Sequence, residues 1–197
     1  MNVSTTQQRI AELAKQWPQM SFTSLNHSLD VDWLREAYRR LRKDSAPGYD
    51  GQTGADYGKD LETNLPSLLD RAKSGTYFAP PVRRVHIPKG PGKDTRPIGI
   101  PATEDKLLQR AVAMLLEPIY EQDFLDCSYG FRPGRSAHGA LSALWSQCMT
   151  GGITWILDVD ISQFFDTLDQ PHLRSFLRLL PTSMRETQSF MAYSHSY

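Results

Sequence analysis

The chain has 197 residues and equal numbers of acidic and basic side chains, so its formal net charge is zero. Hydrophobic residues make up 40% of it, which is ordinary for a soluble protein with a core, and no apolar run is long enough to predict a membrane span. The polar N-terminus has no signal-peptide pattern, and Cys127 and Cys148 lack zinc-site or disulfide-framework spacing. A cytoplasmic location is the default expectation.

The charges are distributed unevenly along the chain. Residues 71–110 contain nine basic and three acidic side chains, a net charge of +6, whereas residues 111–197 contain nine acidic and five basic ones, a net charge of −4. This pattern fits a phosphate-binding surface beside a metal-binding one. Two solvated faces of opposite sign are the alternative, and charge alone favours that interpretation.

Apolar residues recur at helical spacing in several segments. Asp30 and Thr103 stand where they can cap helices, Gly75 can end one, and Pro118 is expected to kink or stop another. The pattern predicts helices at 10–17, 31–42, 57–73, 103–118, 136–148 and 170–180.

Three segments have the pattern of strands. The β-branched run around residues 82–88 is followed by the turn sequence G-P-G-K-D at 90–94 and a returning run at 96–100, which predicts a β-hairpin. The prolines in these runs confine the hairpin to a sheet edge or to short pairing. A further strand is predicted over 154–160. Helices and strands in this order indicate an α+β fold.

The strand predicted over 154–160 runs into the sequence D-V-D-I at 158–161. A carboxylate at the end of a strand is a typical magnesium ligand, because Mg²⁺ prefers hard oxygen donors. The carbonyl of Ile161 can add another oxygen beside Asp160. For an isolated D-x-D, however, a strand-end cap or a salt bridge is the more common role.

The D-x-D is not isolated, because characteristic blocks precede it in a fixed order. They are A-P-G-Y-D-G at 46–51, R-A-K-S-G-T-Y at 71–77, V-H-I-P-K at 85–89, R-P-I-G-I-P at 96–101, L-E-P-I at 116–119 and S-Y-G-F-R-P-G-R-S at 128–136. In this order and spacing, over roughly residues 31–180, the chain resembles the group II intron reverse transcriptase/maturase family.

The resemblance implies the fingers and part of the palm of a right-hand polymerase. It divides the chain into an N-terminal polar extension at 1–30, a fingers-like region at 31–150, the first palm strand with its following helix at 151–180, and a tail at 181–197 that does not match.

The resemblance also assigns roles near the active centre. Asp160 resembles the first catalytic aspartate, a ligand of Mg²⁺ beside the Ile161 carbonyl. Lys89 and Arg96 resemble the residues that hold the incoming triphosphate, for which a point charge and a planar fork are suited. Phe165 occupies the position of the aromatic steric gate that selects deoxynucleotides, and without the family it would be interpreted as a core aromatic.

The remaining basic residues of the fingers are candidates for contacts to RNA. Arg83, Arg84 and Lys93 are interpreted as contacts to the template backbone, or as solvated charges. Two aromatics of the 128–136 block, Tyr129 and Phe131, can stack on a base, although packing is the simpler interpretation.

Two arginines of the same block, Arg132 and Arg135, either position the RNA template or hold their own loop. An ion pair with Asp123 or Asp126 is an equal alternative.

The implied activity is RNA-directed DNA polymerisation on an intron RNA template, with a DNA primer, dNTPs and Mg²⁺, together with a maturase role. No Tyr-x-Asp-Asp, the family's second metal-binding motif, occurs in the sequence. The chain is therefore expected to be truncated and inactive alone, unless a C-terminal chain or segment supplies the missing palm and thumb. A non-catalytic RNA-binding remnant of a maturase is the alternative.

Overall fold

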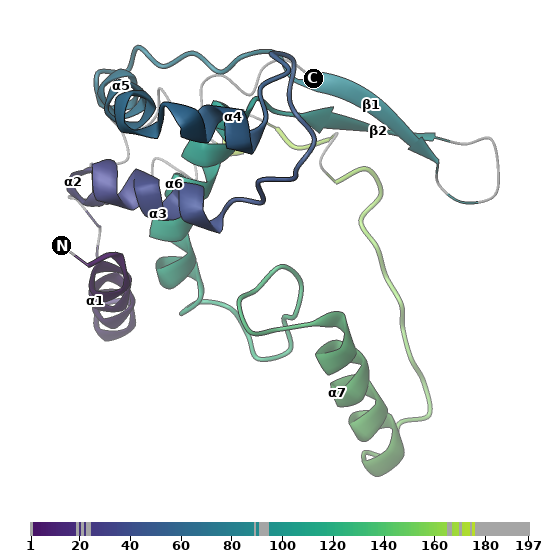
Figure 1. Cartoon of the computed structure of the whole chain (residues 1–197). Helices are drawn as coiled ribbons and strands as arrows, with labels where there is room; N and C mark the ends of the chain where they lie inside the picture. The colour runs from purple at the N-terminus through teal and green to yellow at the C-terminus, as the bar shows by residue number, and fades with distance from the viewer. Residues whose placement is uncertain are drawn as a thin grey trace.

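The computed structural model describes residues 2–18, 20, 22, 25–88, 90, 95–164, 167–169, 171–173 and 175. Within these ranges the chain forms helices and one two-stranded sheet (Figure 1). The elements are α1 (Val3–Gln16), α2 (Leu25–Ser28), α3 (Val31–Arg40), α4 (Gly54–Lys59), α5 (Leu61–Lys73), β1 (Arg83–Pro88), β2 (Thr95–Ile100), α6 (Thr103–Tyr120) and α7 (Ala137–Thr150). No described helix is both long and apolar enough to cross a membrane.

The hydrophobic core is built around α6. This helix buries residues at helical spacing, among them Leu107, Ala111, Met114 and Leu115, because α1 and α3 both pack along it. The helix α5 packs against α3 and closes the core from a further side (Figure 1).

Two long-range hydrogen bonds tie the flanking helices to α6. The indole N–H of Trp33 donates to the Ala111 carbonyl at 2.9 Å, and the amide of Gln7 donates to the Met114 carbonyl at 3.0 Å. The second bond places α1 in the same core, so residues 3–16 of the segment expected to be a polar extension over 1–30 are packed. Its helix is also longer than the one predicted at 10–17.

The course of α6 differs from the prediction at both ends. Ala102 is the N-cap, while the hydroxyl of Thr103 donates to the Gln52 carbonyl at 2.7 Å. The helix also continues through Pro118. Proline has no N–H, so it cannot bond to the carbonyl four residues earlier, that of Met114. That carbonyl accepts the hydrogen bond of Gln7 instead.

The predicted helix at 57–73 is divided in two. Thr53 and Asp56 form a reciprocal capping box that starts α4, and Asp60 separates α4 from α5. The expected cap of α3 is confirmed, since the Asp30 carboxylate accepts the N–H of Trp33 at 2.7 Å.

The predicted hairpin is confirmed. Strands β1 and β2 pair antiparallel, with Arg83 opposite Ile100 and Pro88 opposite Thr95. The two strands project from the helical body (Figure 1), and all of their side chains are exposed or half-buried. It is therefore an edge element, as its prolines predicted.

The predicted helix at 136–148 is also confirmed. It is α7, and the Ser136 hydroxyl caps it by accepting the N–H of Gly139 at 3.1 Å. None of its residues is buried.

The strand predicted over 154–160 is wrong, because residues 152–161 have no regular secondary structure. A strand needs a neighbour for its backbone hydrogen bonds, and no other described strand lies beside this segment. The helix predicted at 170–180 falls mostly outside the described residues.

We expect the indole of Trp33 to be a major source of stability, since it is 1% exposed and bonded to α6. Trp33→Ala should lower the free energy of unfolding by about 3–5 kcal/mol. Trp17→Ala is the matched control, because the Trp17 side chain is 57% exposed, and it should cost less than about 1 kcal/mol. Urea denaturation followed by circular dichroism measures both, and equal losses would contradict the assignment.

Candidate functional site

The hairpin presents its three arginines on two faces. Residues opposite each other in an antiparallel pair share a face, and Ile87 lies opposite Arg96. Because side chains alternate along a strand, Arg83 and Arg96 share one face and Arg84 lies on the other. The face of Arg83 and Arg96 also carries Val85, Ile87, Ile98 and Ile100.

The three guanidinium groups differ in their partners. Arg83 donates from Nε to the Pro47 carbonyl at 3.0 Å, which ties the base of the hairpin to the preceding turn. Arg84 and Arg96 are exposed and make no side-chain hydrogen bond or ion pair with any other described residue. These two groups are consequently available to an external anion. The other predicted hairpin and gate residues, Lys89, Lys93 and Phe165, lie outside the described residues.

The A-P-G-Y-D-G block at 46–51 packs against the start of α6. A Cβ on Gly48 would lie 2.5 Å from the Ala102 Cα, so only glycine permits this approach. The Lys106 ammonium group donates to the Ala46 carbonyl at 2.6 Å. Burial, with a smaller effect of nearby Arg83, lowers the pKa of Lys106. The block thus joins α6 to the hairpin base.

A partly buried ion pair joins the end of α5 to the first turn of α6. Arg71 donates two hydrogen bonds to the Glu104 carboxylate, at 3.1 and 2.7 Å, and the Tyr57 hydroxyl donates to the same group at 3.3 Å. Burial, reinforced by the Glu104 charge, raises the pKa of Tyr57. The sequence did not indicate Glu104 as the partner of Arg71.

A neighbouring buried group fixes the chain just before the hairpin. The Tyr77 hydroxyl donates to the Asp105 carboxylate at 3.2 Å, and the amide of Gln109 donates to the same carboxylate at 2.8 Å. Burial raises the pKa of Asp105, although both hydrogen bonds act in the opposite direction. The R-A-K-S-G-T-Y block therefore supplies two anchors, Arg71 and Tyr77, that hold the chain leading into β1.

Arg132 holds the loop that follows α6. Its side chain is 5% exposed and pairs with the Glu121 carboxylate at 2.6 Å, lowering the pKa of Glu121. It also donates to the carbonyls of Leu125 at 2.8 Å and Ser128 at 2.7 Å, and lies over the Phe124 ring. Of the alternatives set out from the sequence, these contacts fit the positioning of the loop. A contact of Arg132 with RNA stays a prediction.

The same loop exposes an aromatic side chain. Arg135 pairs with Asp126 at 3.3 Å and lies over the Tyr129 ring, as one alternative predicted for this arginine. Phe131 has a φ of 56° and a fully exposed ring. Packing of Phe131 against the described residues is therefore not observed, and its positive φ is unusual for a residue other than glycine.

The described residues do not assemble a metal site. Asp160 and Ile161 lie in the exposed segment after α7, with Asp158 beside them. The described part contains no group of three or more His, Cys, Asp or Glu side chains placed to hold an ion. Carboxylate oxygens suit Mg²⁺, but their number here is too small to define its coordination.

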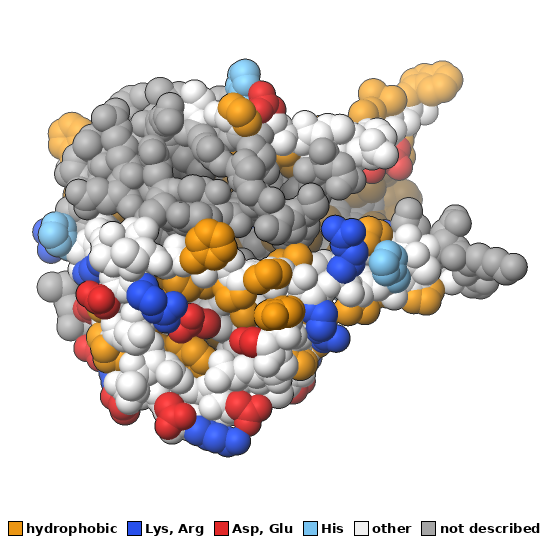
Figure 2. Space-filling view, turned by 90° about the horizontal axis from the view of Figure 1, so that it is seen from above, with side chains coloured by type: hydrophobic (Ala, Val, Ile, Leu, Met, Phe, Trp, Pro, Cys, Tyr) orange, Lys and Arg blue, Asp and Glu red, His pale blue; other side chains and the backbone are white. Residues whose placement is uncertain are grey.

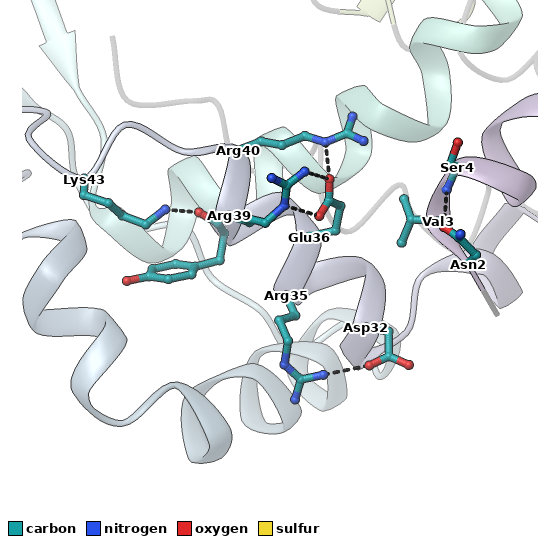
Figure 3. A pocket seen from close by; sticks show the side chains of 10 residues that line it. Asn2, Val3, Ser4, Asp32, Arg35, Glu36, Arg39, Arg40 and Lys43 are labelled. Atoms are coloured by element: carbon teal, nitrogen blue, oxygen red, sulfur yellow. Dashed lines mark hydrogen bonds and ion pairs between the residues drawn. The ribbon is translucent and has the colours of Figure 1, made fainter.

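An open pocket of about 680 Å³ lies between the start of α1 and α3 (Figure 3). Its arginines already have carboxylate partners. Arg39 and Arg40 bind Glu36 at 2.6 and 2.7 Å, and Arg35 binds Asp32 at 2.7 Å. Hydrogen bonds from the two arginines lower the pKa of Glu36 to about 2. Two arginines share Glu36, and among the described residues Lys43 donates only to backbone carbonyls, so the lining keeps more positive than negative charge.

The surface seen from above mixes basic, acidic and apolar side chains (Figure 2). No continuous stripe of one sign is visible among the described residues on that face. On that face the described basic side chains are therefore scattered among acidic and apolar ones and do not form a broad basic surface.

Comparison with known proteins gives a consistent assignment. Residues 87–193 match the family described as reverse transcriptase (RNA-dependent DNA polymerase). The chain is 39% identical over 185 residues to protein YkfC of Escherichia coli (strain K12), covering 90% of this chain and 48% of YkfC. It is 41% identical over 127 residues to the group II intron-encoded protein LtrA of Lactococcus lactis, covering 64% of this chain and 21% of LtrA.

A more distant relative is the putative COX1/OXI3 intron 1 protein of Saccharomyces cerevisiae, 31% identical over 162 residues that cover 76% of this chain and 18% of the relative. The chain thus spans about half the length of YkfC and about a fifth of LtrA. The family match begins in β1 and continues past Asp160. Together with the intron-encoded relatives, it shows that the chain belongs to the group II intron reverse transcriptase/maturase family.

Proposed function

We propose that this chain forms the fingers and the first part of the palm of an RNA-directed DNA polymerase of the group II intron type. The observation that carries the proposal is the family match over 87–193, which includes both β2 and the D-V-D-I motif. In this proposal the template is intron RNA, the primer is DNA, and dNTPs are the substrates.

In the proposed enzyme, the hairpin contacts the incoming nucleotide and the template. We assign Arg96, together with Lys89, to the triphosphate and Arg84 to the template backbone. The support for this is that Arg84 and Arg96 are exposed and have no partner among the described residues. A hairpin whose base is anchored by Arg83 can present such groups at a fixed place.

Asp160 is the proposed first metal-binding carboxylate, with the Ile161 carbonyl beside it. These two oxygen donors fill only part of a magnesium coordination shell. A segment carrying Tyr-x-Asp-Asp, as relatives of greater length can provide, has to supply the other carboxylates. We propose accordingly that the 197-residue polypeptide does not polymerise when it is alone.

A non-catalytic role in binding intron RNA is the second candidate. It is favoured by one observation, namely that Arg84 and Arg96 of the hairpin are exposed and have no partner among the described residues. RNA binding without any gain of polymerase activity on complementation would select this candidate.

Complementation tests the catalytic proposal. We expect no primer extension by the purified chain with an RNA template, dNTPs and Mg²⁺, and extension when a Tyr-x-Asp-Asp segment of a relative such as LtrA is added. In the complemented enzyme, Asp160→Asn should reduce extension by at least about a hundredfold. Asp158→Asn is the matched control, two residues away, and should stay within about tenfold of the wild type.

Extension by the chain alone, lost in Asp160→Asn, would contradict the requirement for a second segment. Equal effects of the two substitutions in the complemented enzyme would contradict the assignment of Asp160.

The salt dependence of RNA binding tests the hairpin. Each lost phosphate contact should lower the slope of log K against log salt by about 0.7 on single-stranded RNA. The double variant Arg84→Ala/Arg96→Ala is therefore expected to lower it by about 1.4, measured by fluorescence anisotropy. Arg39→Ala is the control, because Arg39 is 74% exposed but already paired with Glu36. An unchanged slope in the double variant would exclude these contacts.

A further inference from the structure

A buried carboxylate lies at the junction between α6 and the chain that leads into the hairpin. Asp105 is in the first turn of α6 and is 8% exposed, and the Tyr77 side chain bonded to it is 3% exposed. The Tyr77 hydroxyl and the Gln109 amide donate to its two oxygens, at 3.2 and 2.8 Å. From Tyr77 the chain continues to β1 (Figure 1), so this contact fixes the segment from which the hairpin starts.

Asp105 has no basic partner among the described residues. The basic side chain of this cluster is Arg71, and both ends of its guanidinium fork donate to Glu104, at 3.1 and 2.7 Å. Arg71 also lies over the Tyr77 ring. The adjacent carboxylates therefore differ, because Glu104 is paired with a cation whereas Asp105 accepts hydrogen bonds from neutral groups.

The groups around Asp105 favour its neutral form. Burial raises the pKa of Asp105, and the charge of Glu104 on the same helix acts in the same direction. Arg71 of α5 and the Tyr57 hydroxyl of α4 both donate to Glu104 instead. The Tyr77 hydroxyl stays protonated, because burial raises its pKa as well.

We propose that Asp105 is a protonation-dependent anchor of the hairpin. The junction with Tyr77 is most stable when the carboxyl is neutral, and it opens more readily when the carboxyl is ionised, because opening returns the charge to water. A neutral carboxyl keeps an acceptor for the Tyr77 hydroxyl, and its O–H can donate to the amide oxygen of Gln109 once that amide has turned over. The anchor acts in the isolated chain, whether or not the chain polymerises.

The direction of the pH dependence follows from the difference between the folded and the unfolded chain. A carboxyl whose pKa is higher in the folded chain stabilises the fold only while it is protonated. The contribution of Asp105 is therefore present at low pH and is lost as the pH rises through its folded pKa. A side chain that is neutral at every pH should keep this contribution throughout.

Thermal unfolding of Asp105→Asn tests the anchor in the full chain. At about pH 7.5 the substitution should raise the melting temperature by about 2–4 °C. The gain should fall toward zero as the pH approaches the ordinary range of an aspartate, about 3.9. Glu104→Gln is the matched control on the adjacent residue, and it should lower the melting temperature because it breaks the pair with Arg71. A less stable Asp105→Asn chain at neutral pH, or a gain that does not change with pH, would overturn the proposal.

Hydrogen exchange locates the effect at the junction. The Tyr77 N–H donates to the Arg71 carbonyl at 2.9 Å, so its exchange reports the opening of this segment. At neutral pH it should exchange about three- to tenfold more slowly in Asp105→Asn than in the wild type. The Leu34 N–H at the start of α3 is the reference and should change less. Equal slowing of both amides would contradict a local anchor.

Carbon NMR of the wild-type chain measures the group without any substitution. In a chain labelled on aspartate and assigned through bonds, the Asp105 carboxyl should titrate above the ordinary range of an aspartate. A midpoint within or below that range would mean that the two hydrogen bonds and the start of α6 outweigh burial, and the proposal would then be wrong.

Discussion

The position of α6 in the core is the constraint on which the other elements depend. Its carbonyls at Ala111 and Met114 accept hydrogen bonds from α3 and α1, and its buried side chains form most of the contact with both helices. The first turn of α6 supplies Glu104 and Asp105 to the residues that lead into the hairpin. One helix therefore sets the place of the N-terminal core and of the base of the projecting arm.

The hairpin combines a fixed base with an open surface. The base is held by a glycine that permits close backbone approach, by carbonyl contacts of Arg83 and Lys106, and by buried carboxylates. Beyond it, Arg84 and Arg96 have no partner among the described residues. An arrangement of this kind orders the backbone before a ligand arrives, so less conformational entropy is lost on binding.

Local chemistry explains what the sequence could predict. The hairpin follows from turn residues between β-branched runs, and the caps at Asp30 and Ser136 follow from short-range hydrogen bonding. The strand over 154–160 could not be settled this way, because strand pairing depends on a distant neighbour. The candidate residues were found through motif order, whereas the Glu121 partner of Arg132 depends on how the loop folds back onto the end of α6.

Pro118 determines how the C-terminal part of α6 is connected to α1. By withholding one N–H it leaves the Met114 carbonyl to Gln7, so the first helix completes the last turns of the sixth. Removal of the first sixteen residues would leave the Met114 carbonyl without its donor and would expose the apolar stripe of α6. Both lie directly before the loop that Arg132 holds. The N-terminal helix α1 therefore stabilises the junction between the core and the polymerase motifs.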